Sequence, residues 1–194
     1  MANISRITDR IWTGGDLPSE RGTEAMLADL ADIRAAGITH IIDNRIEWSD
    51  EEFVARRAPG LRYTWNGQDD AGQAMPATWF DTGVFAAVET LAQPTGGVLV
   101  HCHMGINRGP SMALAILLAL DWDVVEALDD VRDARPIAAM GYSRDALDWW
   151  LDVSGAEDRV RRQQRAARVA WHRAHPLDVV RIIRQVRLGD PEAA

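Results

Sequence analysis

One stretch of the sequence reads VLVHCHMGINRGPS at residues 98–111, and it places an arginine six positions after the chain's only cysteine. The apolar run at its start predicts a buried strand. Gly109 and Pro110 predict the start of a helix, because proline suits the first helical position. Between strand and helix, Gly105 allows the positive φ that a tightly curled loop needs. This order of elements predicts a loop that holds an anion against a thiolate.

Phosphoryl transfer from an ester suits such a loop, because the reaction needs a nucleophile and donors for the phosphate oxygens. Cys102 is the candidate nucleophile, since loop N–H groups and a helix N-terminus stabilise a thiolate. Arg108 is the candidate phosphate ligand, because a guanidinium grips two oxygens at once. The remaining residues of the predicted phosphate-binding loop are His103, Met104, Gly105, Ile106 and Asn107.

The departing oxygen of an ester needs a proton, and a carboxylic acid on a facing loop is the expected donor. Asp69 and Asp70 lie in the loop predicted at residues 66–76, between a strand and a helix. Asp70 is the preferred candidate and Asp69 the second. The alternative interpretation of the pair is a solvated acidic turn.

Supporting roles are predicted for other polar residues. His101 is expected to shape the loop by hydrogen bonding rather than to carry a proton, and Asn107 to hold the loop through its amide. His103 either tunes the potential of the loop or is exposed without effect. Asp43 and Arg45 follow a predicted strand, and bracing or surface pairing is favoured over substrate contact. A structural role is likewise favoured for an arginine that precedes proline, Arg135.

These motifs resemble the dual-specificity branch of the protein tyrosine phosphatase superfamily. The family pattern, histidine-cysteine, five residues and arginine, is present from His101 to Arg108, and Asp70 precedes Cys102 by 32 positions, where the family has its acid. The aromatic pair Trp79 and Phe80 follows as in the family, and the similarity covers about residues 4–152. The resemblance implies a phosphoprotein phosphatase with a phosphocysteine intermediate on Cys102, phosphate binding by Arg108 and Asp70 as general acid.

One position departs from the family. The residue after the family arginine is usually serine or threonine, whose hydroxyl stabilises the leaving thiolate during hydrolysis of the phosphocysteine. Here that residue is Gly109, and the nearest hydroxyl belongs to Ser111. We therefore expect the phosphoenzyme to break down slowly relative to its formation.

The fold class predicted from the alternation of apolar runs and helical patterns is α/β. By the resemblance, a central and mainly parallel sheet has helices on both faces. The predicted strands are 4–7, 10–13, 38–42, 61–65 and 98–101, and the predicted helices are 23–36, 77–91, one from 109 onward, 123–134 and 143–153. Core stripes are expected at Leu27, Leu30 and Ile33 and at Phe80, Val84, Val88 and Leu91. A phosphatase domain is predicted at 1–154 and a basic helical extension at 155–194, interrupted at Pro176.

Charge is unevenly divided between these two parts. Residues 155–194 hold nine arginines and five acids, a balance of +4. Because the whole chain has a net charge of −8, residues 1–154 have a net charge of −12. An acidic domain repels polyanions, which argues against nucleic acid or inositol-lipid substrates. The arginines of the extension could instead form a site for a polyanion such as nucleic acid. The favoured alternative is a helix docked on the acidic domain with its arginines in solvent. The arginines concerned are Arg159, Arg161, Arg162, Arg165 and Arg168.

Two other functions stay open. Gly105-Ile106-Asn107-Arg108 is similar to the loop of RNA 5′-triphosphatases of the same superfamily, and a phosphate-binding module without catalysis would need the same loop. The acidic domain argues against the first, and the intact cysteine, arginine and acid argue against the second. The expected partner is therefore a phosphorylated protein or another phosphomonoester.

The remaining features set the expected environment. One cysteine excludes an internal disulfide and fits a reducing cytoplasm. No secretory signal is visible, and the longest apolar run, 112–120, is too short to span a bilayer. Five scattered histidines predict no metal site, and no cofactor is expected. The pattern does not specify an oligomeric state.

Overall fold

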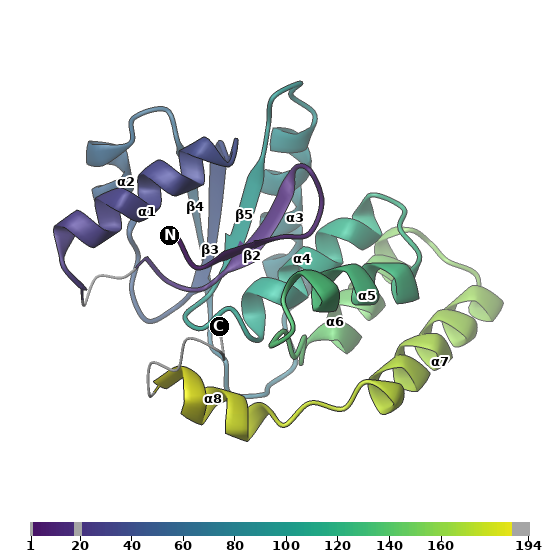
Figure 1. Ribbon diagram of the computed structural model, residues 1–194. Helices are drawn as coiled ribbons and strands as arrows, with labels where there is room; N and C mark the ends of the chain where they lie inside the picture. Colours follow the sequence, from purple (N-terminus) through teal and green to yellow (C-terminus); the bar gives the residue numbers. More distant parts are fainter. Residues whose placement is uncertain (1, 18–20, 188–194) are drawn as a thin grey trace.

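A computed structural model describes residues 2–17 and 21–187 of the chain, and a five-stranded sheet runs through its centre (Figure 1). The strands lie in the order β1-β2-β5-β3-β4, with β1 antiparallel to β2 and the other neighbours parallel. Their bounds are β1 Ile4–Arg6, β2 Ile11–Gly14, β3 His40–Arg45, β4 Arg62–Gln68 and β5 Val98–His101. The mainly parallel sheet confirms the predicted α/β class.

Helices cover both faces of this sheet. On one face α1 (Thr23–Ala35) and α2 (Glu51–Arg57) pack on strand residues such as Ile41 and Leu99. On the other face the neighbouring residues Ile42 and Val100 pack against the remaining domain helices. This alternation follows from the two-residue period of a strand. The second group of helices comprises α3 Ala77–Leu91, α4 Arg108–Ala119, α5 Val124–Ala134 and α6 Ser143–Val153.

Helix α4 lies at the centre of the larger core, and its residues 112–118 are at most 1% exposed. Its apolar character on all sides therefore matches its place between sheet and helices. The helix begins at Arg108, one residue before the predicted start at Gly109. Pro110 is therefore its third residue, where the first helical position was predicted. Pro110 still lies in the first turn, where a missing N–H leaves no helical hydrogen bond unmade.

Several predicted details were wrong. Met26 replaces Leu27 on the buried face of α1, since Leu27 is 36% exposed, and Val88 of α3 is 39% exposed. The sequence interpretation did not include α2. Strands β3 and β4 each extend three residues past their predicted ends, to Arg45 and Gln68. The ladder between them continues to these residues, and the buried side chains of Asn44 and Asn66 are hydrogen-bonded to each other.

The basic extension forms two helices, α7 (Asp158–Ala174) and α8 (Val179–Arg187), separated around Pro176. Helix α7 packs on α5 and α6, and its Trp171, 4% exposed, belongs to the larger core and donates to Asp129 at 2.5 Å. Arg161 and Arg165 pair with acids of α6, as expected for a docked helix. The division into a domain and an extension stays a prediction.

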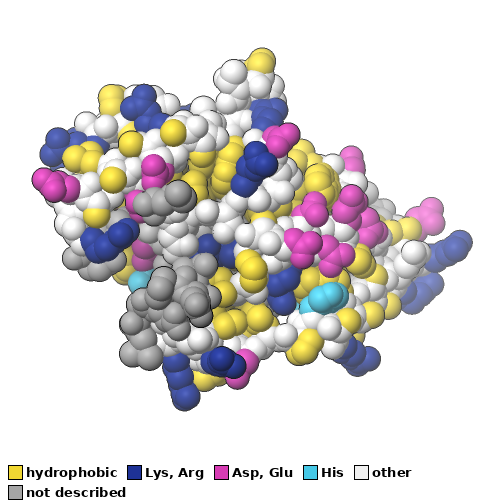
Figure 2. Space-filling model, in the orientation of Figure 1, with side chains coloured by type: hydrophobic (Ala, Val, Ile, Leu, Met, Phe, Trp, Pro, Cys, Tyr) yellow, Lys and Arg dark blue, Asp and Glu magenta, His cyan; other side chains and the backbone are white. Residues whose placement is uncertain are grey.

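The surface reflects the uneven charge of the sequence. On the face drawn in Figure 2, acidic side chains gather over the region of α5 and arginines project at the far end of α7. Within the described ranges, no helix combines the length and the apolar character needed to cross a bilayer.

Candidate active site

Cys102 lies directly after β5, at the carboxyl end of the parallel strands, where ligand sites of such sheets form. Its backbone N–H donates to the carbonyl of Gly14 at 3.3 Å, and the residue is only 2% exposed. Cys102 lines a cavity of about 400 Å³, which is also lined by Asp70, Arg108 and Glu47. The candidate nucleophile, phosphate ligand and acid, distant in sequence, therefore meet in one cavity.

The loop after Cys102 is held from behind by Arg135. Its Nε donates to the carbonyl of Gly105 at 2.6 Å and its Nη2 to that of Met104 at 3.0 Å. A trans peptide points its N–H opposite to its C=O, so the following N–H groups point away from Arg135. Gly105 has a φ of 65°, as predicted for the curled loop, and a Cβ there would lie 2.6 Å from the Arg135 guanidinium. The favoured structural role of Arg135 fits this position.

Arg108 points inward and is 2% exposed. Its Nη1 and Nη2 donate to Glu47 at 2.9 and 2.7 Å, and Nη1 also donates to the carbonyl of Gln68 at 2.8 Å. Burial lowers the pKa of Arg108, but its hydrogen bonds to Glu47 outweigh this and leave the pKa raised. The buried Nε has no hydrogen-bond partner within the described residues, so one donor is available to an oxyanion.

Glu47 is a site residue that the sequence interpretation missed. It lies between β3 and α2, 61 positions before Arg108, and no motif marks it. Burial raises the pKa of Glu47, but the hydrogen bonds from Arg108 outweigh burial, and the net pKa is lowered. Glu47 is therefore ionised at neutral pH and fixes the direction of the guanidinium.

Asp70 lines the cavity with its carboxyl group oriented by two donors. Its Oδ1 accepts from Asn107 Nδ2 at 2.6 Å and from the Tyr142 hydroxyl at 2.7 Å. Its Oδ2 lies 3.5 Å from Arg108 Nε. The neighbouring Asp69 instead accepts from the backbone N–H of Asp70 and does not line the cavity. The geometry therefore favours Asp70 over Asp69.

Asn107 and Tyr142 connect the phosphate-binding loop to the acid. Asn107 Oδ1 accepts from the Gly141 N–H at 2.5 Å, so the amide bridges two segments rather than only holding its own loop. A Cβ at Gly141 would come within 2.6 Å of that oxygen. Burial and then the hydrogen bond to Asp70 raise the pKa of Tyr142 to about 12, so its hydroxyl stays a donor.

His101 and His103 differ in their surroundings. Burial lowers the pKa of His101 to about 4, so the ring is neutral and carries no proton for catalysis at neutral pH. Its Nδ1 lacks a hydrogen-bond partner within the described residues, and Nε2 lies 3.6 Å from Asp43. The loop-shaping role of His101 by hydrogen bonding therefore stays a prediction. His103, at the cavity, has a partner in Asp16 and contacts the Trp48 ring edge-on.

A buried charge cluster surrounds Arg45, whose side chain is 0% exposed. The guanidinium pairs with Asp43 at 2.7 Å, Asp50 at 2.6 Å and Asp16 at 2.9 Å. Asp43 and Arg45 do pair, but both are buried, so a surface location was a wrong prediction and bracing of the loop stays a prediction. Because Asp16 also binds His103, the cluster connects to a residue that lines the cavity.

Gly109 and Ser111 occupy the start of α4. A Cβ at Gly109 would lie 3.1 Å from backbone atoms of His101 and Val100, so a side chain there would require this backbone to move by a few tenths of an ångström. Ser111 is fully buried, and its hydroxyl oxygen accepts from the Tyr142 N–H at 3.3 Å. The two residues therefore support the packing of the loop against the sheet and Tyr142.

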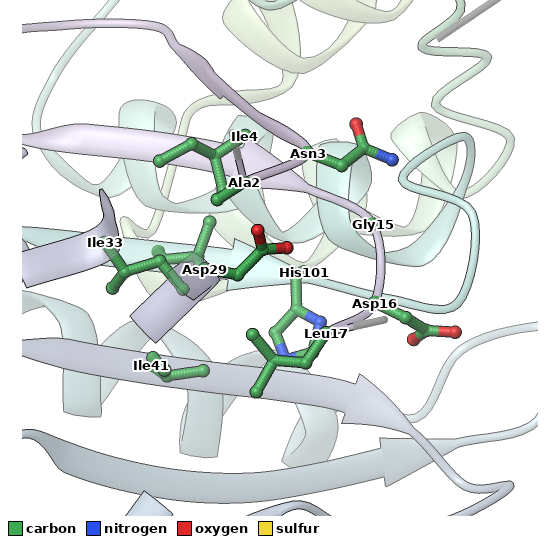
Figure 3. Close-up of a pocket in the computed structure, with 11 residues that line it drawn as sticks. Ala2, Asn3, Ile4, Gly15, Asp16, Leu17, Asp29, Ile33, Ile41 and His101 are labelled. Atoms are coloured by element: carbon green, nitrogen blue, oxygen red, sulfur yellow. The ribbon is translucent and has the colours of Figure 1, made fainter. Parts of the chain in front are cut away.

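A second cavity lies behind the loop, among Ile33, Ile41, Asp29 and His101 (Figure 3). Its volume is only about 10 Å³, roughly that of one water molecule, and its walls are mostly apolar. A phosphate ester does not fit there. The cavity around Cys102 is the candidate substrate site because Cys102, Arg108 and Asp70 line it together. The described residues contain no group of three histidine, cysteine or acidic side chains that would hold a metal ion.

The fold and this cysteine-arginine loop define a member of the protein tyrosine phosphatase superfamily. The family model for the dual specificity phosphatase catalytic domain matches residues 22–148, and the chain belongs to that family. Dual specificity protein phosphatase 26 of Mus musculus is 30% identical over 144 residues, covering 72% of this chain and 65% of that protein. The chain thus spans less than two thirds of this relative.

Other similar proteins agree with this assignment. Dual specificity protein phosphatase 14 of Homo sapiens is 26% identical over 158 residues, or 80% of this chain and 73% of that protein. Among solved structures, human DUSP28 has a TM-score of 0.63 at 16% identity, covering 79% of this chain and 97% of that one. Mouse putative dual specificity phosphatase has a TM-score of 0.62 at 18% identity, covering 80% and 91%. These structures support the fold.

Proposed function

We propose that this protein hydrolyses phosphomonoesters of phosphorylated proteins through a phosphocysteine on Cys102. The observation that carries the proposal is the meeting of Cys102, Arg108 and Asp70 in one cavity, where the buried Arg108 Nε has no hydrogen-bond acceptor among the described residues. Membership of the dual specificity phosphatase family supports the substrate class. The need for a free thiol fits a reducing compartment such as the cytoplasm.

The first step transfers the phosphoryl group to sulfur. The Cys102 thiolate attacks phosphorus, an S–P bond forms and the ester P–O bond breaks. Asp70 gives its proton to the departing oxygen, and Oδ2 is the oxygen that carries this proton because Oδ1 already accepts two hydrogen bonds. Arg108 and the loop N–H groups neutralise the equatorial oxygens of the phosphoryl group.

The second step returns the enzyme to its starting state. Water attacks phosphorus, Asp70 as carboxylate accepts a proton from that water, and the S–P bond breaks. Cys102 leaves as thiolate and inorganic phosphate is released. At this stage the usual hydroxyl after the arginine is missing, because Gly109 occupies that position.

Hydrolysis of p-nitrophenyl phosphate tests the proposal. We expect Cys102→Ser to abolish turnover of p-nitrophenyl phosphate. On an alkyl phosphate, whose departing oxygen needs a proton, we expect Asp70→Asn to lower kcat about 100-fold, which is a typical contribution of general acid catalysis. Asp69→Asn is the matched control, since Asp69 lies outside the cavity, and should retain wild-type activity. Equal losses in the two asparagine variants would overturn the assignment of the acid.

Triphosphorylated RNA is the second substrate to assay. Glu47 and Asp70 place two carboxylates at the cavity, which disfavours a polyanionic chain. We therefore expect slower release of phosphate from RNA than from a phosphotyrosine peptide. Faster release from RNA would favour the RNA 5′-phosphatase alternative, and inactivity on every substrate would leave a phosphate-binding module.

A further inference from the structure

We infer that α8 is a specificity element of the active site and that it selects aryl phosphates with a neighbouring acidic group. The inference rests on the proposed function. Val179, Ile183 and Arg187 line the same cavity as Cys102, and their spacing of four residues places them on one face of the helix. All three lie outside residues 22–148, which the family model matches.

The position of α8 is fixed by apolar packing on the phosphate-binding loop itself. Ile182, 9% exposed, forms a cluster with Ile106 of that loop and with Ile137. Partly buried side chains of the same helix, including Val186, extend this cluster. Burial of apolar surface of this kind stabilises the docked position of the helix. In Figure 1, α8 accordingly lies at the end of the sheet where the loop is found.

Helix α8 forms a wall of the cavity and does not fill it. With the helix docked, the cavity still has about 400 Å³, within the range of small-molecule sites. The hydrogen bonds and ion pairs of Arg108 and Asp70 involve no described residue of α8. An inhibitory segment would instead occupy these groups.

The chemistry of the wall indicates which esters it favours. Ile106, Ala139, Val179 and Ile183 give the cavity an apolar side, on which an aromatic ring gains more burial than the short stem of a phosphoserine. Arg187 is the exposed cation of this wall, and no described carboxylate pairs with it. Arg108, by contrast, is engaged by Glu47. A phosphotyrosine with an acidic neighbour therefore fits both features.

Selectivity ratios of α8 variants test the inference, with kcat/KM measured on three phosphopeptides. The peptides carry phosphotyrosine beside acidic residues, phosphotyrosine beside neutral residues, and phosphoserine beside neutral residues. Arg187→Glu should lower the acidic-to-neutral ratio about fivefold, mainly through KM, as for an exposed ion pair. Ile183→Ala should lower the phosphotyrosine-to-phosphoserine ratio about fivefold through lost ring contact.

Two control variants lie on the same helix but outside the cavity. Arg184→Glu changes the same charge as Arg187→Glu, and Val180→Ala trims a side chain that is 60% exposed. Both should leave the ratios unchanged. Equal effects of Arg184→Glu and Arg187→Glu, or a rise in activity on all peptides in Ile183→Ala, would overturn the inference. Cys102-dependent hydrolysis of p-nitrophenyl phosphate separates this failure from failure of the proposed function.

Discussion

Asn107 and Asp70 lie 37 positions apart and share a hydrogen bond of 2.6 Å between the amide nitrogen and the carboxyl Oδ1. A residue of the phosphate-binding loop thus orients the candidate acid directly. The Tyr142 hydroxyl donates to the same oxygen at 2.7 Å, which leaves Oδ2 to carry the proton. One amide therefore links the candidate phosphate-binding loop to the candidate acid.

Removing either donor should misplace the acid. We expect Asn107→Ala and Tyr142→Phe each to lower kcat about tenfold for alkyl phosphates, and less for p-nitrophenyl phosphate, whose leaving group needs little protonation. The measurement is the dependence of kcat on the leaving-group acidity, together with the melting temperature of each variant. A uniform loss over all leaving groups would indicate a purely structural role for both residues.

Glu47 is predicted to position Arg108. Glu47→Gln should lower kcat/KM for p-nitrophenyl phosphate about tenfold, since a hydrogen bond to a charged group contributes about 1.5–3 kcal/mol. Glu51→Gln, at an exposed acid in the first turn of α2, is the control. The inhibition constant of inorganic phosphate should rise in parallel in the Glu47 variant. Tighter phosphate binding and faster turnover would instead mean that Glu47 obstructs the arginine.

Slow breakdown of the phosphoenzyme is expected because Gly109 supplies no hydroxyl to the leaving thiolate. Rapid mixing with p-nitrophenyl phosphate should give a burst of p-nitrophenol close to the enzyme concentration, followed by a slower steady rate. Cys102→Ser should show neither phase. Gly109→Ser restores a hydroxyl at this position and should raise the steady rate, with a shift of a few tenths of an ångström in the backbone of His101 and Val100, from which the new Cβ would lie 3.1 Å. A linear time course without a burst would contradict the prediction.

Stability should fall when the solution is acidified from pH 6.5 to pH 4. Burial lowers the pKa of His40, His101 and His172 to about 4 each, so in this range the unfolded chain binds three protons that the folded chain does not. Burial raises the pKa of Asp16 to about 6, which has the opposite sign and offsets one proton. The net difference lowers the free energy of unfolding by roughly 2 kcal/mol per pH unit.

Urea unfolding at pH 7, 6 and 5 measures this slope. His172→Gln removes one of the three histidines that the unfolded chain protonates, so the slope should fall by at most about 1.4 kcal/mol per pH unit. His172 bonds to Ser143 at 2.8 Å, and glutamine retains polar atoms for that contact. His175→Gln, at an exposed histidine, is the control. A free energy of unfolding that rises between pH 7 and pH 5 would contradict the assignment.

The sequence by itself determined the features that depend on neighbouring residues. The bounds of α3, α6 and β5 agree with the prediction residue for residue, because apolar periodicity and helix or strand length are local properties. The loop from Cys102 to Arg108 could also be predicted from the sequence, because the strand before it and the helix after it are its immediate neighbours in the chain.

Only the tertiary structure decided which distant side chains complete the site. Glu47 reaches Arg108 across 61 positions, Asn107 reaches Asp70 across 37, and Ile182 of α8 packs on Ile106. No local pattern encodes such pairs, because they depend on how strands are ordered and how helices dock on them. Long-range packing also buried Arg45, which local polarity had suggested could lie at the surface, by surrounding it with three carboxylates in the same fold.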